Sequence, residues 1–128
     1  MAAEVERGEL LARYILTKRH IRSSNNTVKP EAFMPHPYID LSVTRHKGIT
    51  VSQLWVLGNA VAGQQSKLLH GRSDINSSDV MANELSVQSD PTPQNPNHAN
   101  ILGWSGVKSE QKLVAMELAK QASEILYP

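Results

Sequence analysis

The sequence has no cysteine among its 128 residues, which excludes a disulfide framework and a thiolate metal site. Aromatic residues make up only 5% of the chain, so Leu, Ile, Val, Met and Ala must fill most of the core. No apolar run approaches the roughly 18 residues that a transmembrane helix needs. The acidic N-terminal stretch MAAEVERGEL lacks the apolar segment of a secretory signal. These absences predict a cytoplasmic protein with no membrane partner.

Short catalytic and cofactor motifs are also missing. The sequence has no Walker-type phosphate loop, no GxGxxG fingerprint, no GxSxG elbow and no HExxH zinc motif. The five histidines include no pair four residues apart, which is the spacing that brings two imidazoles together on a helix. The sequence therefore predicts no metal site and no cofactor.

The overall charge is nearly balanced but unevenly distributed. The net charge is +1 and the pI about 8.1, which is too mild to indicate a nucleic-acid-binding protein by charge alone. The segment from Arg13 to Arg22 nevertheless carries several basic side chains and no acid. A local positive patch on a single domain of ordinary globular composition is the expected result.

Periodicity predicts alternating strands and helices. Residues 38–45 read as a strand, because Ile39, Leu41 and Val43 alternate with polar residues. Residues 50–63 read as a helix with a Thr50–Gln53 capping box, and we expect Trp55 on its buried face against strand 38–45. The other predicted elements are strands 66–75, 85–88 and 98–104, helices 77–85 and 109–126, and an irregular loop at 89–97.

These elements predict an α+β fold, a small and mostly antiparallel sheet with two main helices packed on one face. One segment stays ambiguous. Residues 4–22 are compatible with a helix or a strand, since an apolar stripe at 5–16 is weakened by Gly8.

The stretch HGRSDI, residues 70–75, suggests a site. In an extended chain His70, Arg72 and Asp74 share one face, and together they would supply a proton acceptor, a cation and an orienting carboxylate. An exposed Arg72–Asp74 ion pair is the plainer alternative. If this strand lies beside strand 38–45, Arg72 and Arg45 can share one anion, with Asp74 orienting His70.

Two further segments contribute candidate residues. Arg45 and His46 lie between a strand end and a capped helix, a place that favours anions. His98 and Asn100 follow the proline-rich loop, where functional residues are common. The candidates for proton transfer are His46, His70 and His98, and those for ligand binding are Arg22, Arg45, Arg72, Asp74 and Asn100.

The sequence leaves two functions open. The first is recognition of a phosphate-bearing ligand such as RNA or a nucleotide, extending to RNA cleavage without a metal. The second is a non-enzymatic protein-interaction or accessory module, in which the same residues form surface contacts. The oligomeric state is not predicted.

Overall fold

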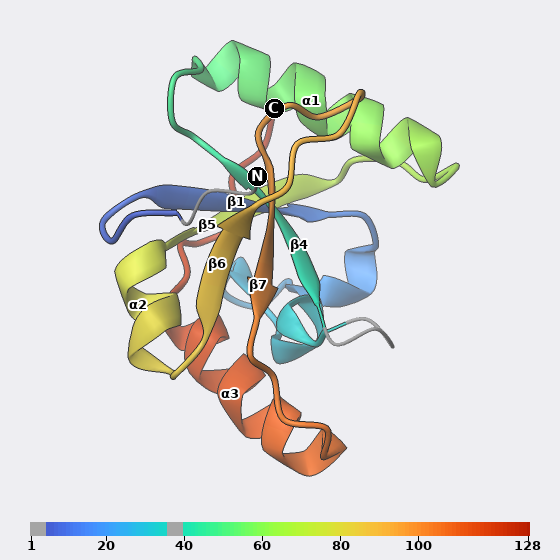
Figure 1. Cartoon of the computed structure of the whole chain (residues 1–128). Helices are drawn as coiled ribbons and strands as arrows, with labels where there is room; N and C mark the ends of the chain where they lie inside the picture. Colours follow the sequence, from blue (N-terminus) through green and yellow to red (C-terminus); the bar gives the residue numbers. More distant parts are fainter. Residues whose placement is uncertain (1–4, 36–39) are drawn as a thin grey trace.

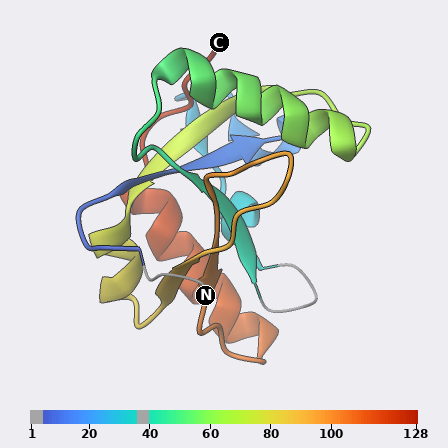
Figure 2. The same cartoon turned by 45° about the horizontal axis from the view of Figure 1, so that its top comes forward.

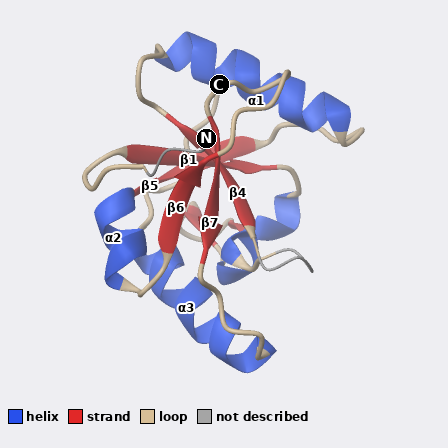
Figure 3. Cartoon of the chain, in the orientation of Figure 1, coloured by secondary structure: helices blue, strands red, loops and turns tan. Residues whose placement is uncertain are grey.

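The computed structural model describes residues 5–35 and 40–128. Its centre is a five-stranded sheet in the order β5-β1-β4-β7-β6, with every neighbouring pair antiparallel. The strands are β1 (Leu10–Ile15), β4 (Leu41–Arg45), β5 (Gly71–Asn76), β6 (Ser86–Ser89) and β7 (His98–Leu102). The predicted α+β class with an antiparallel sheet is confirmed, and residues 10–15 of the ambiguous segment form a strand (Figure 3).

The remaining elements surround this sheet. The helices are α1 (Val51–Gln64), α2 (Ser77–Ala82) and α3 (Lys108–Gln121). A two-stranded ribbon and two short 3-10 helices follow β1 along the chain; they are η1 (Lys18–His20), β2 (Ile21–Arg22), β3 (Thr27–Val28) and η2 (Pro30–Phe33).

Helices cover both faces of the sheet. Leu11 on β1 belongs to the main core with Leu118 of α3, whereas Ala12 and Tyr14 on β1 form a second cluster with Leu54 of α1. Figures 1 and 2 accordingly show α1 on one side of the sheet and α3 on the other. From the sequence we expect both long helices on one face. The structure differs because β1 is apolar on both faces, so each face needs a cover.

Helix α1 begins as the capping box predicts, since Thr50 and Gln53 make both reciprocal hydrogen bonds. Its buried residues are Leu54, Gly58 and Ala62. The expectation that Trp55 is buried against β4 is wrong, because Trp55 is half-buried and its ring lies 4.7 Å from the guanidinium carbon of Arg72 on β5. Successive helical residues are rotated by roughly 100°, so Leu54 and Trp55 cannot both face the same strand.

Several boundaries differ from the predicted ones. Residues 38 and 39 of the first predicted strand lie outside the described residues. Strand β5 begins only at Gly71 and pairs with β1, so it is not beside β4. Helix α3 ends at Gln121, and the chain then returns to β5, where the main chains of Leu126 and Arg72 exchange hydrogen bonds of 2.9 and 2.8 Å.

Strands β1 and β4 separate after a short paired segment. Their register is Leu11↔Arg45 and Ala12↔Thr44, and beyond it the Arg13 side chain lies between them. Arg13 Nε donates to the main-chain oxygen of Ala32 at 2.7 Å, and Nη1 donates to that of Ser42 at 3.0 Å. The bond to Ser42 satisfies a main-chain oxygen of β4, and the bond to Ala32 satisfies one of η2. The separation opens a groove on the sheet.

Candidate functional site

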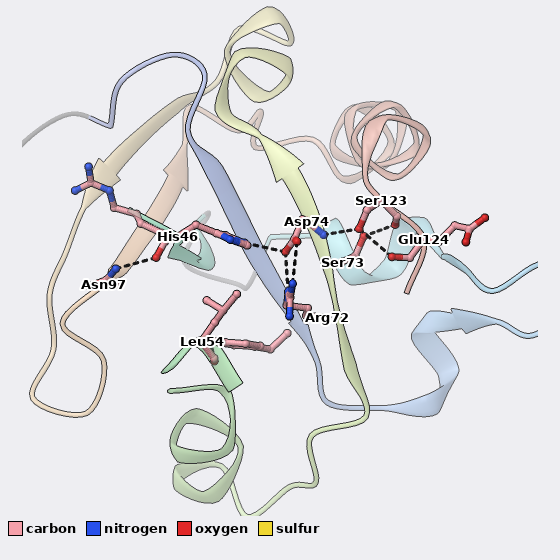
Figure 4. Close-up of polar contacts among 10 residues, drawn as sticks. His46, Leu54, Arg72, Ser73, Asp74, Asn97, Ser123 and Glu124 are labelled. Carbon is pink, nitrogen blue, oxygen red and sulfur yellow. Dashed lines mark hydrogen bonds and ion pairs between the residues drawn. The ribbon is translucent and has the colours of Figure 1, made fainter. Parts of the chain in front are cut away.

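Three of the predicted site residues meet at one carboxylate. Asp74 accepts hydrogen bonds from His46 Nε2 at 3.0 Å and from Arg72 Nε and Nη2 at 3.1 and 3.3 Å (Figure 4). The two donors come from different elements, since Arg72 shares β5 with Asp74 while His46 follows β4. Asp74 therefore orients His46, whereas the sequence analysis pairs it with His70.

This network is shielded from solvent. The side chains of Arg72 and Asp74 are 7% and 11% exposed. Burial alone would raise the pKa of Asp74, but the hydrogen bonds from His46 and Arg72 lower it below the ordinary value of 3.8. Asp74 is consequently an anion at neutral pH, and as an acceptor it requires the proton on Nε2 of His46.

Arg45 has its own carboxylate partner. Its Nε and Nη2 each donate to one oxygen of Glu9 at 2.9 Å, a two-bond pairing that matches the shapes of both groups. Burial alone would raise the pKa of Glu9, but the hydrogen bond from Arg45 lowers it. Arg45 and Arg72 thus bind separate carboxylates.

The loop before β7 fixes the turn that carries His46. Asn97 Nδ2 donates to the main-chain oxygens of Arg45 at 2.8 Å and Lys47 at 3.0 Å. Asn95 is buried and donates to the hydroxyl of Thr44 at 2.7 Å. The predicted irregular loop has neither helix nor strand at residues 90–97, yet these bonds anchor it to β4.

His98 and Asn100 converge on a different acid, Asp90. His98 Nδ1 lies 2.7 Å from the main-chain oxygen of Asp90 and 3.4 Å from its Oδ2, while Nε2 lies 3.1 Å from the hydroxyl of Ser42. Asn100 Nδ2 donates to Asp90 Oδ2 at 2.9 Å. Because Thr44 pairs with His98 in the sheet register, Ser42 is a diagonal neighbour of His98 on the same face.

The two remaining candidates lie elsewhere. His70 lines a shallow recess with Lys18 and Tyr127. Arg22 is exposed on β2, and its Nη1 lies 3.4 Å from the hydroxyl of Thr27. The structure therefore brings His46, Arg72 and Asp74 together, places His98 with Asn100, and separates His70 and Arg22 from both groups.

The groove between β1 and β4 brings His98, a candidate from the sequence, together with residues that the sequence does not indicate as site residues. It consists of a recess of about 280 Å³ and a smaller adjoining one of about 50 Å³, both of which Arg13 and Ser42 line. We call it the Arg13 groove; its lining residues include Arg13, His20, Asp40, Ser42, Gln65, Lys67 and His98. The sequence feature that could have indicated this surface is the basic segment from Arg13 to Arg22, which contains no acid and supplies Arg13 and His20.

Electrostatics distinguish the Arg13 groove from the Asp74 network. Burial lowers the pKa of Arg13 to about 10, so the side chain stays charged at neutral pH. Burial also lowers the pKa of His20, and the neighbouring charges of Arg13 and Lys67 lower it further. Both effects favour the neutral form of His20.

Neither a metal nor a membrane helix is indicated by the described part of the chain. Residues 5–35 and 40–128 contain no group of three or more acidic or histidine side chains that could hold a metal ion. Over the same ranges, no helix has the length and apolar character needed to cross a membrane.

We compared the chain with known proteins by sequence and by structure. No family model, no curated protein and no solved structure matches the chain.

Proposed function

We propose that this protein binds a phosphate-bearing ligand of about mononucleotide size in the Arg13 groove. Arg13 and Lys67 supply the positive charge, and Ser42 and Gln65 offer hydrogen bonds to the rest of the ligand. The proposal keeps the ligand class that the sequence favours and assigns it to a surface between the separated strands.

The observation that carries this proposal is the lack of a carboxylate partner for Arg13. Its hydrogen bonds go to two main-chain oxygens, and within the described residues it forms no ion pair. Burial lowers the pKa of Arg13 from 12.5 to about 10, so holding the charged form there without a carboxylate is unfavourable. An anion bound beside Arg13 would offset part of this cost.

Arg45 and Arg72 support an anion site less well. Each already makes two hydrogen bonds to a carboxylate, Arg45 to Glu9 and Arg72 to Asp74. A phosphate would have to displace those carboxylates, leaving a half-buried acid without its partner. For this reason we place the ligand at Arg13.

The size and composition of the groove also suit a small ligand. Its main recess, about 280 Å³, is close to the roughly 300 Å³ at which small-molecule sites begin. Asp40 is the one acid among the described residues that line it. Lys67 is exposed and flexible, so its ammonium group can follow the phosphate without disturbing the fold.

The test is a titration with inorganic phosphate and adenosine monophosphate, followed by amide NMR shifts, with adenosine as the ligand without phosphate. We expect shifts around residues 13, 42 and 65–67. Lys67→Ala should weaken phosphate binding about tenfold, or about 1.4 kcal/mol. The matched control is Lys108→Ala, which removes an exposed lysine on α3, on the opposite face.

A second variant tests Arg13 directly. Arg13→Gln keeps a donor for the main-chain oxygens but removes the charge, and it should abolish the phosphate response. Saturating shifts that are identical in the wild type, Lys67→Ala and Lys108→Ala would contradict the proposal, as would the absence of shifts at millimolar phosphate.

A further inference from the structure

Ser42, His98 and Asp90 form a continuous hydrogen-bonded chain at the Arg13 groove. The tautomer of His98 follows from its partners, because the main-chain oxygen of Asp90 can only accept. Nδ1, 2.7 Å away, must therefore carry the proton. Nε2 of the neutral ring is then the acceptor for the Ser42 hydroxyl at 3.1 Å.

His98 is joined to Asp90 through its main chain as well as through its imidazole. The main-chain NH of Asp90 donates to the oxygen of His98 at 2.8 Å, in addition to the bond from Nδ1. The Asp90 carboxylate lies 3.4 Å from Nδ1 and is itself held by Asn100. A carboxylate at this position helps to hold the ring in this orientation.

Ser42 is open to a ligand while its base is sheltered. Ser42 is exposed and lines both recesses of the Arg13 groove, whereas the His98 side chain is 15% exposed. Arg13 Nη1 bonds the main-chain oxygen of Ser42 at 3.0 Å, so a cation lies beside the same residue. Positive charge at that place stabilises an oxyanion that develops next to the hydroxyl.

We propose that Ser42 is a catalytic nucleophile, activated by His98 as general base, and that it cleaves ester bonds in anionic ligands. Asp90 is a positioning residue. The choice of anionic esters rests on the proposed function, since Arg13 and Lys67 would hold the negative group. The nucleophile itself rests only on the hydrogen-bonded chain.

The reaction is a hydrolysis in which water is the second reactant. Ser42 Oγ attacks the ester carbonyl carbon and passes its proton to His98 Nε2. The tetrahedral intermediate expels the alcohol, which takes that proton, and an acyl-Ser42 ester remains. Water then attacks this ester through the same base, which releases the acid and restores the Ser42 hydroxyl.

The primary test is covalent labelling of the full chain with a fluorophosphonate probe, read by intact mass and peptide mapping. We expect one adduct on Ser42 and none in Ser42→Ala. His98→Gln should slow labelling by about 100-fold or more, the usual contribution of a general base. The control is Ser52→Ala, which removes an exposed serine of α1 and should not change the adduct. No adduct at Ser42, or equal rates in the wild type and His98→Gln, would overturn the proposal.

Asp90→Asn provides a second measurement, because it alters an exposed side chain and should leave the fold intact. It should slow labelling and shift the pH profile of the labelling rate; an unchanged rate and profile would remove Asp90 from the mechanism. Circular dichroism of each variant verifies folding.

Phosphate competition separates this inference from the proposed function. Inorganic phosphate should protect Ser42 from labelling, and the amide shifts of the wild type report phosphate binding independently of the label. Phosphate binding without any labelling would leave the proposed function intact and reject the nucleophile. Labelling without protection or binding would keep the nucleophile and reject anionic esters as its substrates.

Discussion

Replacing Asp74 by asparagine should destabilise the protein by about 3 kcal/mol at pH 7. Asp74 accepts one hydrogen bond from His46 and two from Arg72, and the Arg72 side chain is only 7% exposed. Removing one partner of a buried ion pair costs about 3–5 kcal/mol, because the remaining charge lacks compensation. We expect the lower end of that range, since the amide oxygen of asparagine can still accept one of these bonds.

The assay is urea unfolding followed by tryptophan fluorescence, to which Trp55 contributes from its position above Arg72. Glu117→Gln is the control. It removes a carboxylate from an exposed ion pair with Lys120 and should cost less than about 0.5 kcal/mol. The double variant Arg72→Met/Asp74→Leu removes both charges and should be more stable than Asp74→Asn. A loss below about 1 kcal/mol for Asp74→Asn would refute the reasoning, because the network would then be no stronger than a surface pair.

Three further measurements have defined outcomes, the first on Asp74→Asn and the others on two new variants. Folding lowers the pKa of Asp74, so ionised Asp74 stabilises the folded protein above pH 3.8, and this stabilisation is lost as the pH falls through the folded pKa. In acid titrations, Asp74→Asn should therefore show a smaller loss of stability below about pH 4 than the wild type. Thr50→Ala removes the capping box of α1 and should lower the free energy of unfolding by about 1 kcal/mol in urea; no loss would show that the helix start is held by other contacts. Gly58→Ala places a methyl group 2.7 Å from a ring carbon of Tyr14 and should cost about 1–3 kcal/mol by calorimetry, whereas an unchanged melting temperature would mean that α1 can shift away from β1.

Local sequence patterns predicted those elements whose position depends on residues close together in the chain. The Thr50–Gln53 pair located the start of α1, and the alternation of Leu41 and Val43 located β4. The sequence was less informative about which side chains are buried, because burial depends on the element that packs against them. Trp55 and Leu54 are both apolar neighbours on one helix, and only the position of β5 and β1 beneath them decides which is buried.

The candidate site needed the strand order, which no local pattern contains. His46 reaches Asp74 across β1, because β4 and β5 are both neighbours of that strand. The contact between Ser42 and His98 requires the register that sets Thr44 opposite His98. Arg13 belongs to an acid-free basic segment that is visible in the sequence, but its role depends on the separation of β1 from β4. Long-range pairing thus decides which polar residues meet.

The strand order has a consequence for synthesis on the ribosome. Strand β1 is made before every other strand of the main sheet, yet its partners are β4 and β5. Between Ile15 and Asn76 the ribosome adds about 60 residues, which at 5–20 residues per second takes roughly 3–12 s. During that interval the apolar segment LLARYI has at least one unpaired edge and is exposed to other nascent chains. Residues 71–76 carry Arg72 and Asp74, and they also complete the pairing of β1. Their synthesis therefore ends the interval in which β1 is vulnerable to aggregation.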